Sequence, residues 1–193
     1  MMPAKGSEAM NTHTALVRLV QAAIFAAFLC ICSPLTVPVG AIPFSMAIFA
    51  VMLCGVILEW KTGLLAVLVY LALGLFLPIF HGGNTGLTAI PGPTGGFIWS
   101  YPLMIPLICG IQGRRSRSYP LDVLRAFLGC VTGIAICYLC GTLHFTAYAK
   151  APLSKALKVC VLPFILPDLA KAAAAALLGT AIRNVLHRAG YAD

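Results

Sequence analysis

Charged residues are scarce in this sequence: Asp, Glu, Lys and Arg make up only 9% of its 193 residues, whereas soluble domains contain about 25%. Hydrophobic residues reach 61%, and the mean hydropathy is +0.98. Apolar runs long enough to cross about 30 Å of hydrocarbon recur along almost the whole chain. The composition therefore excludes a water-soluble fold and indicates a single all-α domain packed in the lipid bilayer.

Several motifs of enzyme and nucleotide chemistry are also missing. There is no Gly-x-x-x-x-Gly-Lys-Ser/Thr phosphate loop, so any ATP-driven step needs another subunit. Cys137, Cys140 and His144 share one helical face but have no fourth ligand, and we expect no metal site and no catalytic residues. The net charge of +8 is spread between apolar runs and does not form a patch, which argues against nucleic acid as a partner. Most of the eight cysteines lie inside apolar runs and suit the role of small core residues.

Six apolar runs predict a bundle of six transmembrane helices. A polar segment, residues 1–14, precedes a membrane domain over residues 15–188. The first run is not closed by a small-x-small cleavage site, which favours a retained helix over a signal peptide. The predicted spans are 15–33, 43–58, 63–80, 97–112, 122–145 and 160–186.

The distribution of Lys and Arg predicts that both termini are cytoplasmic, because cytoplasmic connections retain basic residues. With the N-terminus inside, the outer side holds only Lys150, Lys155 and Lys158. The inner side then holds Lys5, Arg18, Lys61, Arg114, Arg115, Arg117, Arg125, Arg183 and Arg188.

Two of the outward connections, residues 34–42 and 81–96, contain no charged residue. The first is rich in proline, which favours extended backbone. The second contains Asn84 and the turn Gly92-Pro93-Thr94-Gly95, whose glycines allow the main chain to approach a ligand. Uncharged irregular backbone at membrane depth lines a cavity or packs on protein, so these loops are candidates for a binding site. An ordinary tight turn is the alternative for 92–95, and Asn84 is also a common turn residue.

Asp168 and Lys171 are the most unusual pair, because they lie near the outer end of the sixth predicted span. Their spacing of three residues puts them on one helical face. A charge at mid-bilayer costs about 2.5–3.5 kcal/mol on insertion scales, and intramembrane charges usually mark a functional site. The alternative is a self-neutralising pair whose lysine reaches the headgroups.

The first span carries Ala22, Ala23, Ala26 and Ala27, two interleaved small-xxx-small pairs that allow close helix packing. The neighbouring helix is either a partner subunit or part of the chain's own bundle.

With these residues in view, roughly residues 15–188 resemble the BioY family, the biotin-specific S components of energy-coupling-factor (ECF) transporters. The resemblance rests on four motifs in order: Pro38-Val-Gly-Ala-Ile-Pro-Phe-Ser45, Gly74-Leu-Phe-Leu-Pro-Ile-Phe80 with its following Gly-Gly, Gly92-Pro-Thr-Gly-Gly-Phe97, and Leu162-Pro-Phe-Ile-Leu-Pro-Asp-Leu-Ala-Lys171.

The resemblance implies a multi-pass protein of the bacterial plasma (inner) membrane that captures biotin with high affinity and needs no cofactor. It implies that Asp168, Lys171 and Asn84 contact biotin. It further implies that the alanine surface of the first span docks on a membrane coupling subunit, which acts with two cytosolic ATPases.

Four alternatives stay open at this point. The chain could be an S component for another small vitamin, or a solitary biotin carrier without the ATPase module. It could also be an intramembrane enzyme using Asp168, Lys171, His81 or His144 as acid and base, or a helical scaffold.

Overall fold

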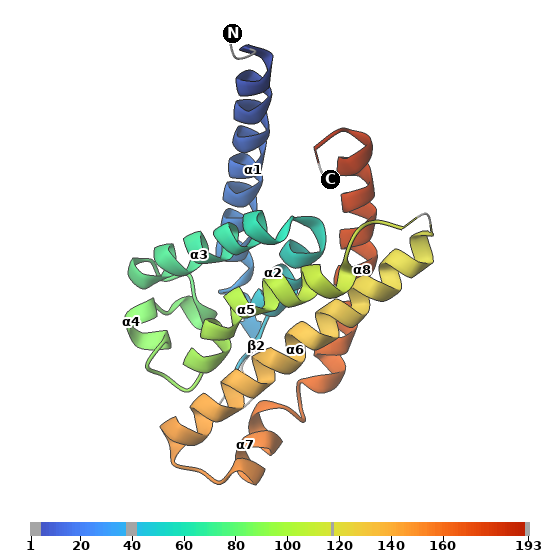
Figure 1. The fold of residues 1–193 in the computed structure, drawn as a ribbon. Coiled ribbons are helices and arrows are strands. Elements are labelled where there is room, and N and C mark those ends of the chain that lie inside the picture. Colours follow the sequence, from blue (N-terminus) through green and yellow to red (C-terminus); the bar gives the residue numbers. More distant parts are fainter. Residues whose placement is uncertain (1–4, 38–41, 117, 192–193) are drawn as a thin grey trace.

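The computed structural model describes residues 5–37, 42–116 and 118–191, and for residues 5–13 it describes the backbone alone. The fold is mostly helical, with one short hairpin (Figure 1). In chain order the elements are α1 (Lys5–Cys32), β1 (Thr36–Val37), β2 (Phe44–Ser45), α2 (Ala47–Ile57), α3 (Trp60–Phe76), the 3₁₀ turn η1 (His81–Gly83), α4 (Gly86–Ala89), α5 (Gly95–Gln112), α6 (Tyr119–Ala149), α7 (Leu153–Cys160) and α8 (Ile165–Arg188).

Five segments of the described chain are long and apolar enough to cross a membrane. They are Thr14–Cys32 within α1, Trp60–Gly83 over α3 and η1, and the whole of α5, α6 and α8. These segments correspond to five of the six predicted spans. The predicted second span, 43–58, instead contains β2 and the 11-residue helix α2. A helix of that length extends about 16 Å, roughly half of the hydrocarbon thickness.

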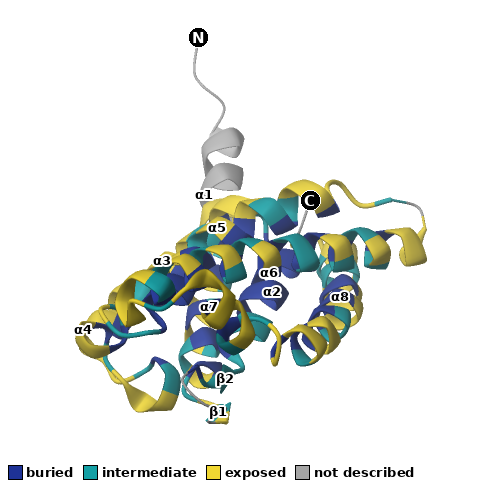
Figure 2. Ribbon diagram, turned by 90° about the horizontal axis from the view of Figure 1, so that it is seen from below, coloured by how far each residue is buried: buried dark blue, intermediate teal, exposed yellow. Residues whose placement is uncertain are grey.

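Helix α2 forms the centre of the fold. Nearly all of its residues are buried, and it contacts α1, α3, α5, α6 and α8. Figure 2 shows it as a dark-blue core inside helices whose outer faces are largely exposed. A helix that is apolar on every side belongs in such an interior, which explains why a short run remains helical without spanning the bilayer.

The two ends of the molecule differ in structure. The start of α1 and the end of α8 project from one side, whereas α4 and α7 lie toward the other (Figure 1). Residues 38–41 of the proline-rich segment lie outside the described residues. On either side of them, Thr36 pairs with Ser45 and Val37 with Phe44 in an antiparallel hairpin. Short helices and a hairpin therefore gather at the end opposite the termini.

Several helix boundaries differ from those expected from hydropathy. Helix α1 begins at Lys5, well before the apolar run starts, and α6 continues to Ala149. The predicted span 160–186 begins at the end of a separate helix, α7, and α8 starts only at Ile165. Hydropathy reports where a chain is apolar, whereas helical hydrogen bonding continues into polar flanks.

Helices α5 and α6 pack closely through glycine. A Cβ atom at Gly129 of α6 would lie 2.9 Å from the Ile108 carbonyl oxygen and 3.2 Å from the Ile108 Cα of α5. Both are backbone atoms, which cannot move aside as a flexible side chain can. The close approach of these helices therefore depends on the missing side chain.

We predict that Gly129→Ala destabilises the protein by about 1–3 kcal/mol, because the added methyl group separates the two helices. Thermal unfolding in detergent measures the effect. Gly110→Ala is the matched control, since Gly110 lies in α5 and a Cβ there has no neighbour within 4 Å. Its melting temperature should equal or slightly exceed that of the wild type, and equal melting temperatures for both variants would contradict the packing argument.

Candidate functional site

Asp168 and Lys171 lie on one inward face of the first two turns of α8, as their spacing predicts. Asp168 is 1% exposed and Lys171 is 8% exposed. The Lys171 ammonium nitrogen is 3.0 Å from Asp168 Oδ1. Two charges removed from water need a partner, and here each is the other's partner.

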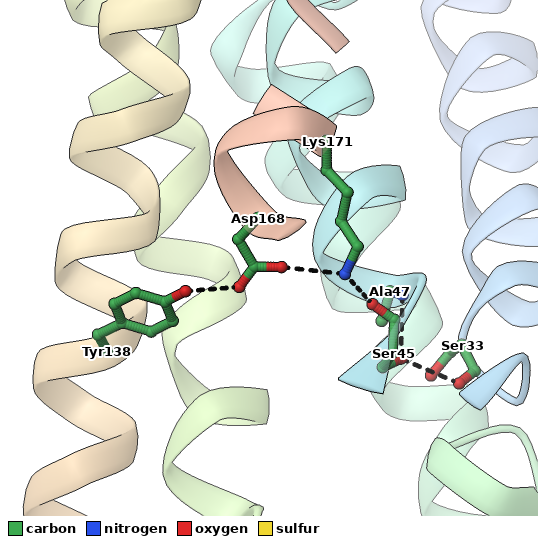
Figure 3. Close-up of polar contacts among 6 residues, drawn as sticks. All are labelled: Ser33, Ser45, Ala47, Tyr138, Asp168 and Lys171. Carbon is green, nitrogen blue, oxygen red and sulfur yellow. Dashed lines mark hydrogen bonds and ion pairs between the residues drawn. The ribbon is translucent and has the colours of Figure 1, made fainter. Parts of the chain in front are cut away.

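Tyr138 of α6 is the second partner of Asp168. Its hydroxyl donates to Asp168 Oδ2 over 2.7 Å (Figure 3). Each carboxylate oxygen therefore accepts one hydrogen bond from the described residues and keeps acceptor capacity for another. A tyrosine in an apolar run carries no motif, so the sequence alone does not identify Tyr138 as a site residue. The signal that could have found it is the need of a buried aspartate for further donors.

Lys171 is held on its other side by the hairpin. Its ammonium group donates to the Ser45 carbonyl oxygen over 2.6 Å and lies 3.6 Å from the centre of the Phe44 ring. The ring face adds a cation–π attraction. Asp168 and Ser45 use two of the three ammonium donors, so one N–H remains available to a ligand.

A chain of hydrogen bonds fixes the Ser45 carbonyl. The Ser45 hydroxyl donates to the Ser33 carbonyl oxygen over 3.2 Å and accepts from the Ala47 amide over 3.0 Å (Figure 3). The Ser33 and Tyr70 hydroxyls lie 2.6 Å apart, which links this group to α3. The position of the Lys171 ammonium thus depends on Ser33 directly after α1 and on residues from β2 and α3 as well as α8.

Asp168 and Lys171 open into a pocket with mainly apolar walls. Small-molecule sites combine such walls with a few polar groups that orient the ligand. The polar contribution comes from hydroxyl groups, a histidine, a thiol and the charged pair. The lining residues are Ser33, Ile42, Pro43, Phe44, Ser45, Ile48, Phe80, His81, Thr94, Phe97, Ile98, Tyr101, Tyr138, Cys160, Phe164, Asp168 and Lys171.

Only one member of the predicted turn, Thr94, lines this pocket. It is 6% exposed and directly precedes α5. The Gly92 carbonyl oxygen lies 2.9 Å from His144 Nε2, which ties the turn to α6. Pro93 is half-buried and Gly95 is buried, and both are next to the lining residue without being part of the wall.

Asn84 is exposed and is not among the lining residues. Its side-chain amide donates to the His81 carbonyl oxygen over 3.0 Å. The Asn84 side chain therefore stabilises the loop that carries His81, which lines the pocket.

The four alanines of α1 divide into two faces. Ala22 and Ala26 are each 2% exposed, inside the chain's own helices, where α1 packs on α3 and α2. Ala23 and Ala27 are exposed on the outer face. Only the second pair is accessible to another subunit.

The cysteine and histidine face of α6 does not form a cluster. All eight cysteines are unpaired thiols. No group of three His, Cys, Asp or Glu side chains within the described ranges is arranged to hold a metal ion. Cys137 is buried, whereas His144 contacts the Gly92 carbonyl.

Comparison with known proteins agrees with the sequence motifs. "Biotin transporter BioY2" of Lactococcus lactis subsp. cremoris is 32% identical over 182 residues, covering 93% of this chain and 97% of the relative. "Probable biotin transporter BioY" of Bacillus subtilis is 34% identical over 176 residues, covering 89% and 92%.

The fold also has a close structural neighbour. It is the S-component for biotin from an ECF-type ABC transporter, whose crystal structure has a TM-score of 0.75 at 23% identity, with 95% of each chain covered. The model of the BioY family matches residues 6–188. This chain therefore belongs to the BioY family.

Proposed function

We propose that this chain is the biotin-binding S component of an ECF-type transporter, which captures biotin at the outer face and delivers it inward. The observation that carries the proposal is the buried Asp168–Lys171 pair, which lines an otherwise largely apolar pocket. Membership of a family whose relatives are named biotin transporters supports it. Transport by these relatives favours a carrier over the enzyme and scaffold alternatives.

The chemistry of biotin suits the pocket. Its ureido group has two N–H donors and one carbonyl acceptor, and its bicyclic body is apolar. Asp168 has acceptor capacity for a ureido N–H, and Lys171 has a donor left for an oxygen of the ligand. Charge-assisted hydrogen bonds are shorter and roughly twice as strong as neutral ones, and the exclusion of water strengthens them.

The protein is a multi-pass plasma-membrane protein, and residues 15–188 form its substrate-binding domain. Helix α2 and the hairpin together make up the remaining crossing, which is the second in chain order. The pocket lies at the outer end of the bundle, and both termini lie in the cytoplasm. The positive-inside rule supports this orientation, because the basic residues concentrate on the side of the termini. The segment 1–14 is then cytoplasmic.

The energy for transport comes from a membrane coupling subunit and two cytosolic ATPases. The exposed pair Ala23 and Ala27 forms the docking face for the coupling subunit, because small residues let a second helix approach closely. Thr94 is the member of the turn Gly92-Pro93-Thr94-Gly95 that lines the pocket, and Asn84 supports the loop that carries His81. A solitary biotin carrier, or an S component for another small vitamin, remains the second candidate.

We predict that Asp168→Asn and Lys171→Ala each weaken biotin binding by roughly tenfold or more, because each removes a charged partner from a buried site. Isothermal titration in detergent measures the dissociation constants, with thiamine and riboflavin as ligand controls. Glu59→Gln and Lys155→Ala make the same chemical changes away from the pocket and should bind as the wild type does. Unchanged affinity in both pocket variants would refute the assignment of the site, whereas tight thiamine or riboflavin binding would redirect the choice of vitamin.

Tyr138→Phe should weaken biotin binding by about threefold to tenfold, because the lost hydroxyl no longer holds Asp168 Oδ2 in place. The same titration measures this effect. Tyr148→Phe, at an exposed position of α6, is the control and should be neutral. An affinity for the Tyr138 variant equal to that of the control would show that the Tyr138 hydroxyl does not contribute to binding.

Enlarging the outer alanine face should block transport without blocking binding. Ala23→Leu with Ala27→Leu should reduce biotin uptake by cells that contain the coupling module by about tenfold, while the purified variant keeps its biotin affinity. Ala135→Leu, an exposed alanine of α6, is the matched control and should transport normally. Normal uptake by the double variant, or normal uptake after deletion of the coupling subunit, would favour the solitary carrier.

A further inference from the structure

The polar side chains of the pocket form two groups. The first contains Tyr138, Asp168 and Lys171, connected to each other and to Ser45. The second contains His81 of η1 and Thr94, whose hydroxyl oxygen lies 3.4 Å from each ring nitrogen of His81. No hydrogen bond between described residues joins the two groups.

The first group is unfavourable for an anion. The Lys171 charge is balanced by Asp168 at 3.0 Å, and the ammonium is further occupied by the Ser45 carbonyl and the Phe44 ring. A ligand carboxylate placed there would lie beside the Asp168 carboxylate, and like charges repel strongly where water is excluded. An acidic end of the ligand is therefore expected to point away from Asp168.

The second group, His81 and Thr94, is favourable for an anion. His81 and Thr94 both carry hydrogen-bond donors, and among the described residues that line the pocket Asp168 is the only acidic one. The distance of 3.4 Å between the Thr94 hydroxyl oxygen and each His81 ring nitrogen is long for a hydrogen bond, so neither residue uses its donor in a strong hydrogen bond to the other. No described acidic side chain of the pocket other than Asp168 therefore opposes an anion beside His81 and Thr94.

The loop that carries His81 is held in one shape. Gly82 and Gly83 have φ angles of +64° and +77°, which side chains rarely adopt. The Phe80 amide donates to the Asn84 carbonyl oxygen over 3.0 Å, and the Asn84 side chain returns a bond to the His81 carbonyl. Phe80 is fully buried against Tyr70 with the rings edge to face. This closed turn fixes the direction from which His81 reaches the pocket.

We infer that His81 and Thr94 bind the carboxylate of the transported ligand. The substrate class is then a molecule with a cyclic urea or amide at one end, an apolar body, and an acidic group at the other end. The inference rests on the proposed function, because it assigns the acidic tail of biotin to a second part of the same pocket. In either tautomer the neutral histidine ring has one N–H to donate, and Thr94 supplies an O–H.

The test compares biotin with biotin amide, in which a neutral carboxamide replaces the carboxylate. Isothermal titration gives both dissociation constants, and their ratio is the readout. The wild type should prefer biotin by roughly tenfold or more, because hydrogen bonds to a charged acceptor are the stronger ones. His81→Leu should weaken biotin binding by a similar factor and change amide binding much less, so that the preference largely disappears.

Two further variants and one control complete the design. His81→Gln keeps an N–H donor and should recover part of the preference, whereas Thr94→Val should lose part of it. His187→Leu makes the same change as His81→Leu at an exposed position in the last turn of α8, and it should keep the wild-type ratio. Retained amide binding in each pocket variant demonstrates that the pocket is folded.

The outcomes separate this inference from the proposed function. A wild type that binds biotin and biotin amide equally, or a wild-type ratio in both His81→Leu and Thr94→Val, would overturn the carboxylate assignment and leave biotin binding intact. A wild type that binds neither ligand would overturn both proposals. If His81→Leu does not fold, the ratios of His81→Gln and Thr94→Val decide.

Discussion

The ion pair between Asp168 and Lys171 imposes the strongest constraint on the site, because two charges on an apolar helix must be satisfied away from water. A buried ion pair adds little to stability, since desolvation offsets most of the attraction. The pair is tolerated here because α6 supplies the Tyr138 hydroxyl and the hairpin supplies the Ser45 carbonyl. Two separate segments must therefore meet the start of α8 before the pair can be buried, and their meeting creates the pocket.

The short central helix makes room for that meeting. Because α2 extends only about 16 Å, the hairpin strand β2 precedes it in the same segment, and His81 of η1 lines the same pocket as Ile48 of α2. Irregular backbone at membrane depth needs internal partners, and the carbonyls of Ser33 and Ser45 have them. A sixth full-length helix in the same place would have covered the pocket wall with side chains. The hairpin that takes the place of half a transmembrane helix thus leaves main-chain carbonyl oxygens, such as that of Ser45, available as acceptors at the binding site.

The parts of this structure that sequence alone could predict are those that depend on local spacing. Asp168 and Lys171 share a face because helical geometry fixes residues three apart, and hydropathy located five long helices. The length of α2 was not predictable, because an apolar run of 16 residues does not distinguish a helix from a strand followed by a short helix. Tyr138 and Ser45 were missed because their roles arise from contacts across 30 and 126 positions of the chain. The separation of Ala22 and Ala26 from Ala23 and Ala27 likewise required knowing which face of α1 meets α3.

The pairing of Asp168 with Lys171 determines which ligand groups the site can accept. Asp168 and Lys171 each have a partner within the protein, so neither is an isolated charge in the membrane. A ligand must then offer polar groups that match the remaining capacity: donors for the carboxylate and an acceptor for the ammonium. An analogue lacking one of these groups leaves a buried charge short of a partner, and such mismatches reduce affinity more than a missing methylene does. Selectivity in this pocket therefore comes from the pattern of donors and acceptors, while the aromatic walls supply affinity for any apolar body of suitable size.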